Sequence, residues 1–418
     1  MLSDHGETVT ALFFSRGCVF VAALIFGLTY LVVACGRLPF GRLDRTGAAL
    51  IGASLMVASG TLSLNEAYSA IDFDTITLLL GMMIIVGNLR LSGFFGLATE
   101  MIARRATQPL VLLGGIIVVA GLLSAFLVND TVCLMMTPLV IDVARRQGRR
   151  PLPYLLGVAM ASNIGSVATI TGNPQNMIIA SLSHIPYRDF AAALAPVAAL
   201  GLCLALAFIV LGHRAEFRRG AKLPATALKL RWNRPLLIVS LIAAAAAIAG
   251  FFWGIAPPKV AIVVGALLLL HPIKPMRVYR EIDWSLLLLF VGLFIVLAGA
   301  EKALLTPALR QAVEGAGLGR PPILTLVAAV LSNLVSNVPA VLALAPFLGD
   351  LAEPQHAWLV LAMASTLAGN FTILGSVANL IVVERARREG VEISFRGYFR
   401  VGAPLTLATL ALGVWWLS

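Results

Sequence analysis

Two stretches of this chain carry the same polar pattern inside long apolar runs. Residues 159–178 read AMASNIGSVATITGNPQNMI, and residues 362–381 read AMASTLAGNFTILGSVANLI. A duplicated polar segment that interrupts a helix at membrane depth is typical of transporters built from two repeats. An offset of 203 residues superimposes the copies without a gap and pairs Thr169 with Thr372, Gly172 with Gly375 and Asn176 with Asn379.

The composition indicates the class of protein. Of the 418 residues, 59% are hydrophobic and 12% are charged, and the mean hydropathy is +0.94. A soluble protein could not cover so much apolar surface, and apolar runs near the ~20 residues needed to cross a bilayer recur along the chain. The sequence therefore predicts an all-α polytopic membrane protein in contact with the lipid bilayer. The net charge of +11 fits the Lys and Arg that cytoplasmic loops collect, and no nucleic-acid partner is expected.

About ten segments are expected to span the membrane. Two further apolar pairs, 109–146 and 321–350, are each split at a polar point, Asn129-Asp130 in the first and Ser336-Asn337 in the second. The arms after the splits hold 14 and 12 residues, and such arms reach only ~20 Å, short of the ~30 Å hydrocarbon core. Both pairs are therefore predicted to be re-entrant hairpins that enter and leave on one side. The expected spans are residues 17–36, 46–64, 75–94, 153–185, 189–212, 235–254, 258–271, 283–300, 356–384 and 399–417.

The distribution of charge predicts the orientation. Six connecting segments hold 25 of the 31 Lys and Arg residues, and a bias of this kind marks the cytoplasmic side. The layout is that of a multi-pass protein of the inner (plasma) membrane with both termini outside. The six segments are 37–45, 90–105, 145–150, 213–234, 274–280 and 385–400.

The two halves of the chain align throughout. Residues 1–212 and 235–418 each contain five spans and one hairpin, and the basic segment 213–234 joins them on the cytoplasmic side. Because five is odd, the second copy enters the membrane upside down, which makes an inverted-topology repeat. The segments after the third span of each half, 96–107 and 301–316, are expected to lie along the interface as amphipathic helices. The matches pair Ile71-Asp72-Phe73 with Ile282-Asp283-Trp284, and Ser124, Asn129 and Pro138 with Ser332, Asn337 and Pro346.

Four polar breaks interrupt these helices: the hairpin tips 129–131 and 336–339, and the segments 169–174 and 372–376. Unsatisfied backbone groups are costly in hydrocarbon, so such breaks persist only where they are buried in protein or face a wet cavity. Helix starts favour anions or polar oxygens, and the free carbonyls of preceding helix ends suit a cation. We expect the four breaks to form one central substrate site flanked by two ion sites.

Each break has the residues of a helix restart. Asn173 precedes Pro174, a favoured first-turn residue, and Ser376 holds the equivalent capping position. The glycines before these caps are expected to permit the backbone turn. In the hairpins, Asn129 or Asp130 is expected to cap the second arm of the first, and Asn337, two residues before Pro339, the second arm of the other.

The expected site follows from the breaks. A lone Asn, Ser or Thr in a membrane helix usually joins two helices, and we expect that role for Ser124, Ser332 and Asn333, but repetition and helix breaking together favour ligands. The expected substrate ligands are Asn129, Thr131, Asn173, Asn176, Ser336, Asn337, Ser376 and Asn379. The expected ion-coupling residues are Asp130, Asn163, Thr169, Thr366 and Thr372, and the helix-breaking residues are Gly172, Pro174, Pro339 and Gly375. We expect no cofactor and no structural metal, only a coupling H⁺ or Na⁺, with Na⁺ placed near Asn129, Gly172, Asn337 and Gly375.

Asp130 is the residue with the most specific expectation. A carboxylate at bilayer depth is expensive and marks a functional site. Its repeat mate is Val338, so symmetry does not require it. We expect Asp130 to take up and release a proton, or to bind a coupling cation, during transport; the alternative is a permanently ionised helix cap. Cys133, one turn later, is expected to pack as a small apolar residue.

These residues resemble the ion transporter superfamily, which includes arsenite efflux pumps, the pigmentation P protein, sodium/proton antiporters and divalent-anion/sodium symporters. The two hairpin tips and the 172–176 stretch carry the resemblance, which covers nearly the whole chain. The Asn-Asp and Asn-Val-Pro tips are most similar to the arsenite/P-protein branch, and Asp130 stands where the dicarboxylate pattern usually has Thr. The resemblance implies alternating access, in which the part with the hairpins moves as a rigid unit against a scaffold. It leaves open a homodimer and a separate ATPase subunit as partners.

The expected function is that of a secondary transporter, not an enzyme. The leading substrate is a small inorganic oxyanion or its neutral acid, as in arsenite or antimonite efflux, with proton coupling through Asp130. One alternative is a sodium-coupled symporter of di- or tricarboxylates, and another is a sodium/proton antiporter without an anion substrate. An intramembrane enzyme is the alternative of a different class, and the sequence has no Ser/His/Asp or metal-ligand set for it.

Overall fold

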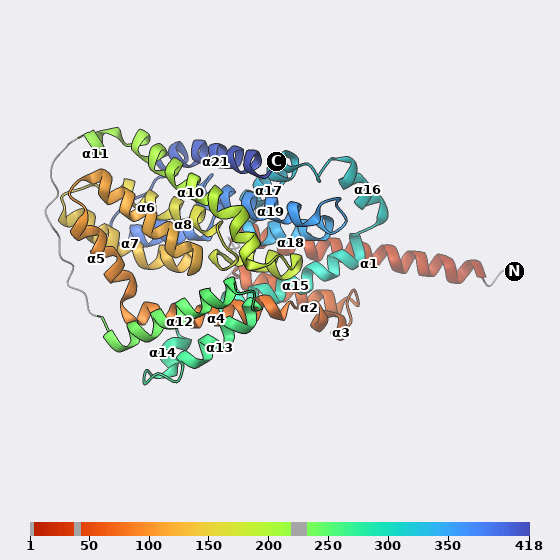
Figure 1. Cartoon of the computed structure of the whole chain (residues 1–418). Coiled ribbons are helices and arrows are strands. Elements are labelled where there is room, and N and C mark those ends of the chain that lie inside the picture. The colour runs from red at the N-terminus through yellow and green to blue at the C-terminus, as the bar shows by residue number, and fades with distance from the viewer. Residues whose placement is uncertain (1–3, 37–42, 219–231) are drawn as a thin grey trace.

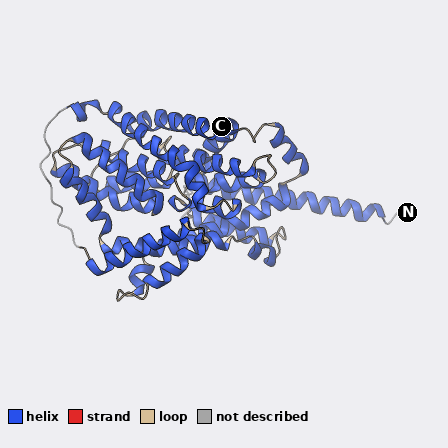
Figure 2. Cartoon of the chain, viewed as in Figure 1, coloured by secondary structure: helices blue, strands red, loops and turns tan. Residues whose placement is uncertain are grey.

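The structure, a computed structural model, describes residues 4–36, 43–218 and 232–418 of the chain (Figure 1). These residues form helices joined by turns and loops, and no strand occurs among them (Figure 2). The predicted all-α fold is confirmed. The described residues leave out most of the predicted basic connection 213–234 and most of the loop 37–45. The predicted roles of these two segments therefore stay predictions.

The same order of helices occurs twice, in agreement with two repeats. A short helix, α11 (Arg214–Arg218), follows the first set. The first set is α1 (Asp4–Cys35), α2 (Arg45–Ala58), α3 (Leu64–Ser69), α4 (Phe73–Ser92), α5 (Phe94–Arg105), α6 (Pro109–Phe126), α7 (Asn129–Arg146), α8 (Pro151–Ser166), the 3₁₀ turn η1 (Ile170–Gly172), α9 (Pro174–Ser183) and α10 (Tyr187–Gly212). The second set is α12 (Arg234–Phe252), α13 (Pro257–Leu268), α14 (Pro275–Tyr279), α15 (Trp284–Leu304), α16 (Pro307–Gly315), α17 (Pro321–Val335), α18 (Asn337–Leu348), α19 (Pro354–Ala368), η2 (Ile373–Gly375), α20 (Val377–Arg388) and α21 (Phe395–Leu417).

Capping side chains start the corresponding helices in both halves. Asp72 caps α4 by accepting from the backbone N–H of Thr75 at 3.2 Å. Its repeat mate Asp283 caps α15 by accepting from Leu286 N at 3.0 Å. The matched Ile-Asp-aromatic triplets of the sequence are therefore two equivalent helix starts, where a short acidic side chain satisfies free N–H groups.

The helices pack in two groups. The first group, which we name the scaffold, consists of α1, α2, α4, α12, α13 and α15. The second, the hairpin bundle, contains the hairpins α6–α7 and α17–α18 together with α8–α10 and α19–α21. In Figure 1, α4, α12 and α13 run along one edge of the molecule, with α8, α10, α19 and α21 beyond them.

The scaffold is interlocked between the repeats through small residues. A side chain at Gly81 of α4 would overlap the backbone of Ala261 in α13. The repeat equivalents behave alike, because a Cβ at Gly292 of α15 would lie 2.7 Å from the carbonyl carbon of Ala49 in α2. Small residues allow such close approach of helices in membranes. In both contacts, a helix of one repeat packs closely against a helix of the other.

Six helices of the described part are long and apolar enough to cross a membrane: α4, α6, α10, α12, α15 and α21. The predicted spans 46–64 and 258–271 are too long, since α2 and α13 have only 14 and 12 residues. In α2 the reason is a turn at Gly60 (φ 75°), followed by Ser63, which caps α3. The predicted interfacial helix 301–316 also begins late, at Pro307, because α15 continues to Leu304.

An exposed ion pair joins the two repeats at the α3 end of the scaffold. Lys302 Nζ donates to Glu66 Oε1 at 2.6 Å. This hydrogen bond is the largest of the influences that hold the pKa of Glu66 low, at about 2. Exposed pairs of this kind add little stability. The association of the two repeats in the scaffold therefore depends mainly on the close contacts at Gly81 and Gly292.

The hairpin tips differ from the prediction. Neither Asn129, Asp130 nor Asn337 caps a helix, because the positions before the second arms are Val128 and Ser336, which make no capping side-chain bond. Both have left-handed backbones, with φ of 55° and 79°. The two are repeat mates, and left-handed residues other than glycine are uncommon and strained. The asparagines begin the second arms and are free to make other contacts.

Candidate transport site

The two discontinuous helices restart as expected. Between α8 and α9, Asn173 Oδ1 accepts from the backbone N–H of Asn176 at 2.9 Å. Between α19 and α20, Ser376 Oγ accepts from Ala378 N at 3.2 Å. Both predicted caps are confirmed, and Pro174 occupies the first turn of α9.

The glycines of the breaks have a different role from the predicted one. Neither Gly172 nor Gly375 has a left-handed backbone. They are required by close approach: a side chain at Gly172 would overlap the carbonyl of Ser166, and one at Gly375 would lie 2.7 Å from Asn333 Oδ1. Gly172 lets the first break fold back onto α8, and Gly375 leaves room for Asn333 of α17.

One asparagine closes each break in the same way. The Asn176 amide donates to the carbonyls of Ser166 and Thr169, both at 3.0 Å. Its mate Asn379 donates to the carbonyls of Gly369 and Thr372, at 2.7 and 3.1 Å. Ser166 and Gly369 lie at the ends of α8 and α19, where carbonyls need partners when no water is at hand. Both amide nitrogens are used by the protein itself.

One threonine ties each break to the hairpin of its own repeat. Thr169 donates to the carbonyl of Ala125 near the end of α6. Its mate Thr372 donates to Asn333 Oδ1 of α17 at 3.5 Å. Asn333 in turn donates to Ala368 O at 3.0 Å, so it joins helices, as predicted. The hairpins and the breaks are thus joined by matching hydrogen bonds in the two halves.

Asn163, near the end of α8, reaches into the other repeat and uses its whole hydrogen-bonding capacity there and at the first hairpin tip. It donates to Asn370 Oδ1 at 2.9 Å and to Asn379 Oδ1 at 3.0 Å. It accepts from Asn129 Nδ2 at 3.2 Å and from Ser376 Oγ at 3.0 Å. A side-chain amide has two donor hydrogens and two acceptor positions, so all four are paired.

Thr366 is the repeat mate of Asn163 and lies near the end of α19. It contacts the break of the first repeat, as Asn163 contacts the break of the second. Its hydroxyl accepts from Asn173 Nδ2 and from Gln175 Nε2, both at 3.2 Å, and donates to Asn176 Oδ1 at 3.5 Å. Each long helix therefore ends against the restarted helix of the other repeat. All these side chains are buried, with exposed fractions between 0% and 4%.

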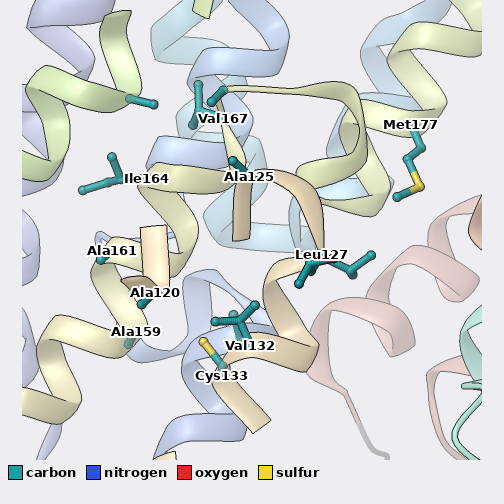
Figure 3. Packing of buried hydrophobic residues seen from close by; sticks show 14 of the residues in the cluster. Ala120, Ala125, Leu127, Val132, Cys133, Ala159, Ala161, Ile164, Val167 and Met177 are labelled. Atoms are coloured by element: carbon teal, nitrogen blue, oxygen red, sulfur yellow. The ribbon is translucent and has the colours of Figure 1, made fainter. Parts of the chain in front are cut away.

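The hairpin tips enter the same network. The carbonyl of Asn129 accepts from Ser162 Oγ at 3.1 Å. Asn337, with its amide nitrogen turned toward two carbonyls, donates to Ser365 O at 3.1 Å and Gly375 O at 3.2 Å and accepts from Gln175 Nε2 at 3.2 Å. The four predicted breaks thus meet in one polar centre. Figure 3 shows buried apolar side chains of α6, α7 and α8 packed together, and buried Cys133 is among them.

Only a few groups of this centre have no protein partner among the described residues. They include Asn129 Oδ1, which is buried and unpaired. The carboxylate of Asp130, the hydroxyl of Thr131 and the hydroxyl of Ser336 take part in no hydrogen bond of the described part, and each is partly accessible. The unpaired groups lie at the hairpin tips, and those of the first tip are mainly acceptors.

Two cavities flank the centre. The first-break cavity, about 310 Å³, lies between α9 and the α12–α13 turn and reaches Ile170. The second-break cavity, about 500 Å³, is lined by the end of α1, the start of α2 and the second break, and it reaches Ser336 and Leu374. Both lie where the scaffold meets the hairpin bundle.

The sequence did not single out three polar residues of the region. Gln175 links Thr366 to Asn337, and Asn370 donates to Met160 O at 3.2 Å besides accepting from Asn163. Asn370 has the apolar mate Val167, so comparison of the repeats passes over it. Arg45 lines the second-break cavity, although its place in a basic loop indicated only a cytoplasmic charge.

The predicted helix-breaking residue Pro339 contacts the scaffold, because its carbonyl accepts from the Tyr30 hydroxyl of α1 at 3.3 Å.

The family and the relatives that this chain matches are all described as transporters. Residues 29–368 match the family described as "Citrate transporter" (CitMHS). A protein of rice, Oryza sativa subsp. japonica, named silicon efflux transporter LSI3, is 28% identical over 95% of this chain and 97% of its own. An uncharacterized transporter of Mycobacterium tuberculosis is 31% identical over 94% of this chain and 98% of its own. The putative transporter arsB of Dictyostelium discoideum is 25% identical over 95% and 90%.

A solved structure supports the fold. The YdaH transporter of Alcanivorax borkumensis superimposes with a TM-score of 0.57, covering 97% of both chains at 16% identity. At this identity the likeness concerns the arrangement of helices. It supports the overall arrangement of helices described above.

Proposed function

This chain is a secondary membrane transporter that belongs to the CitMHS citrate transporter family, and we propose that its substrate is a small inorganic oxyanion or the neutral acid of one. Arsenite or antimonite efflux is the leading case. The relatives named silicon efflux transporter and arsB are compatible with this class, because silicon and arsenic both form small hydroxy acids.

The observation that carries the proposal is the set of unpaired groups at the hairpin tips. Asn129 Oδ1 and the Asp130 carboxylate can only accept hydrogen bonds while Asp130 is ionised, whereas the hydroxyls of Thr131 and Ser336 can donate or accept. A trihydroxy acid offers donors and acceptors in the same small volume. A dianion, in contrast, would be repelled by an ionised Asp130.

Asp130 is proposed to couple transport to protons, with Na⁺ as the alternative cation. It lies in the first turn of α7, beside the unpaired Asn129 oxygen, and no lysine or arginine of the described residues pairs with it. A carboxylate in such a place gains most from a proton or a small cation. The remaining amides of the centre hold the breaks together, so ion coupling through Asn163, Thr169, Thr366 and Thr372 is proposed to be indirect.

Alternating access is proposed to move the hairpin bundle against the scaffold. The two cavities support this, because each lies on the boundary between the groups and each reaches a different break. The bias of Lys and Arg supports an inner-membrane protein with both termini outside. In that orientation the second-break cavity faces the cytoplasm.

The test is reconstitution into liposomes, with arsenite, citrate, succinate and sulfate uptake measured under imposed proton and sodium gradients. We expect arsenite movement driven by a proton gradient, lost in Asp130→Asn. Asp142→Asn is the matched control, since Asp142 lies on the same helix and pairs with Arg146 at 2.8 Å. A fully active Asp130→Asn protein would exclude the coupling role.

A sodium-coupled citrate or dicarboxylate symporter is the second candidate. The description of the matching family favours it. Sodium-driven citrate uptake without pH dependence would identify this activity. Proton flux driven by sodium alone, with none of the four anions moved, would instead identify an antiporter.

A further inference from the structure

The two cavities are equivalent by the internal repeat. Met177 lines the first-break cavity and its mate Leu380 lines the second. The scaffold contributes the α12–α13 turn to the first cavity, and the end of α1 with the start of α2 to the second. Each cavity therefore combines a break of one repeat with scaffold residues of the other, as inverted symmetry requires.

The cavities open toward opposite ends of the fold. Helix α2 begins at Arg45, beside the second-break cavity. The chain then passes along α2 and through α3 to Asp74, in the first turn of α4, which lines the first-break cavity. A path across the scaffold thus separates them, and in the proposed orientation they serve opposite faces of the membrane.

The charges of the two cavities differ although their positions correspond. Arg45, the first residue of α2, lines the second-break cavity, whereas the first residue of α13 is Pro257. The first-break cavity is lined by Asp74 and His184 and, within the described residues, by no lysine or arginine.

The arginine is partly buried and has no carboxylate partner among the residues that the structure describes. Its neighbour Asp44 uses a carboxylate oxygen to cap α2, accepting from Gly47 N at 2.8 Å. A guanidinium offers five donors in a planar fork, which matches the oxygens of an oxyanion. Ser336, with its unpaired hydroxyl, lines the same cavity.

We propose that the second-break cavity is an oxyanion-binding site in which Arg45 captures the negatively charged form of the substrate, and that the first-break cavity has no such site. This deepens the proposed function and rests on it only for the statement that the anion is the cargo. The protein then binds the anion more tightly from the face that carries Arg45. Under the proposed orientation that face is cytoplasmic, as suits efflux.

A native cysteine reports on this site without a known substrate. Cys35 is exposed and lines the second-break cavity together with Arg45. In a variant that keeps only this cysteine (Cys18, Cys133 and Cys203 changed to Ser), Cys35 is modified by an anionic and by a cationic thiosulfonate reagent of similar size. The ratio of the two rates measures the local charge.

The expected result is a preference for the anionic reagent that falls about tenfold in Arg45→Gln, because attraction of one reagent and repulsion of the other both disappear. Arg45→Lys keeps the charge and should keep most of the preference. Arg396→Ala removes an exposed charge at the start of α21 and should leave the ratio unchanged. An equal ratio in the parent and in Arg45→Gln overturns the proposal.

Lipid phosphate is another anion that an arginine could bind, so the measurement is made in two bilayers. In purely zwitterionic liposomes, phosphate, sulfate or citrate should slow modification of Cys35, and Arg45→Gln should abolish this protection. If the charge preference appears only in bilayers with anionic lipid, and no soluble anion protects, the ligand is a headgroup and the proposal is wrong. Absence of arsenite flux, measured separately, would contradict the proposed function and leave this assay intact.

Discussion

Replacing Asn163 by Ala should weaken the joint between the two repeats. The substitution removes four hydrogen bonds, to Asn129, Asn370, Ser376 and Asn379, all within 3.2 Å. A buried hydrogen bond contributes about 1 kcal/mol net, and bonds between membrane helices average about 0.6 kcal/mol. The expected loss in free energy of unfolding is therefore about 2–4 kcal/mol.

The matched control is Asn88→Ala. Asn88 is an equally buried asparagine of α4, but it makes one bond, to Ile84 O of its own helix, and its oxygen is unpaired. Its replacement should cost about 1 kcal/mol or less. Unfolding of both variants in mixed micelles, followed by tryptophan fluorescence, gives the comparison.

Asn163→Asp sharpens the same test. A carboxylate at this position would turn an oxygen toward Asn370 Oδ1 and Asn379 Oδ1, where the amide now donates. Acceptors facing acceptors in a buried site are unfavourable, so Asp should be worse than Ala, although it is closer in shape. If Asn163→Ala costs no more than Asn88→Ala, or if Asp is milder than Ala, the joint does not depend on Asn163.

Three further predictions follow from the geometry. Asn176→Ala and Asn379→Ala should lower stability by similar amounts, about 2 kcal/mol each, since each removes two hydrogen bonds to carbonyls; a difference well beyond that amount in micelle unfolding would contradict equivalent roles. Gly165→Ala should cost about 1–3 kcal/mol through overpacking, because its side chain would overlap Gly121 of α6, whereas Gly114→Ala on α6 meets open space and should be neutral or stabilising in the same assay. Ser336→Gly should relieve the left-handed backbone (φ 79°) and stabilise by about 1 kcal/mol, while Ser336→Ala keeps the strain, so equal melting temperatures would show that the tip is not strained.

The sequence predicted the framework of this protein well, because each decision rested on a local rule. The length of the apolar runs predicted helices where the structure has them. Helix starts were also correct at the triplets that contain Asp72 and Asp283 and at the caps Asn173 and Ser376. The end of α2 was wrong because a turn at Gly60, rather than hydropathy, ends this helix. The tips were wrong because Val128 and Ser336 take left-handed backbones, which residue type does not suggest.

The contacts of the site were less predictable. Repeat alignment pairs Asn163 with Thr366, but it does not tell that each reaches the break of the opposite repeat. That arrangement depends on how the two halves interlock in space. Gly172 was assigned to a turn for a different reason, since its contact with Ser166 of the same repeat exists only once the break has folded back. Whether the named residues bind substrate or ions stays a prediction.

The interlock has a consequence for how the chain is made. During synthesis the first repeat enters the bilayer while Asn163 still lacks Ser376 and Asn379, and while Gly81 still lacks Ala261. We expect the first repeat to stay loosely associated, or to be shielded by the insertion machinery, until the second half of the chain has been inserted. The same exchange of contacts fits a half-length ancestor whose copies inserted in both directions and paired, so that fusion of two genes preserved a homodimer inside one polypeptide.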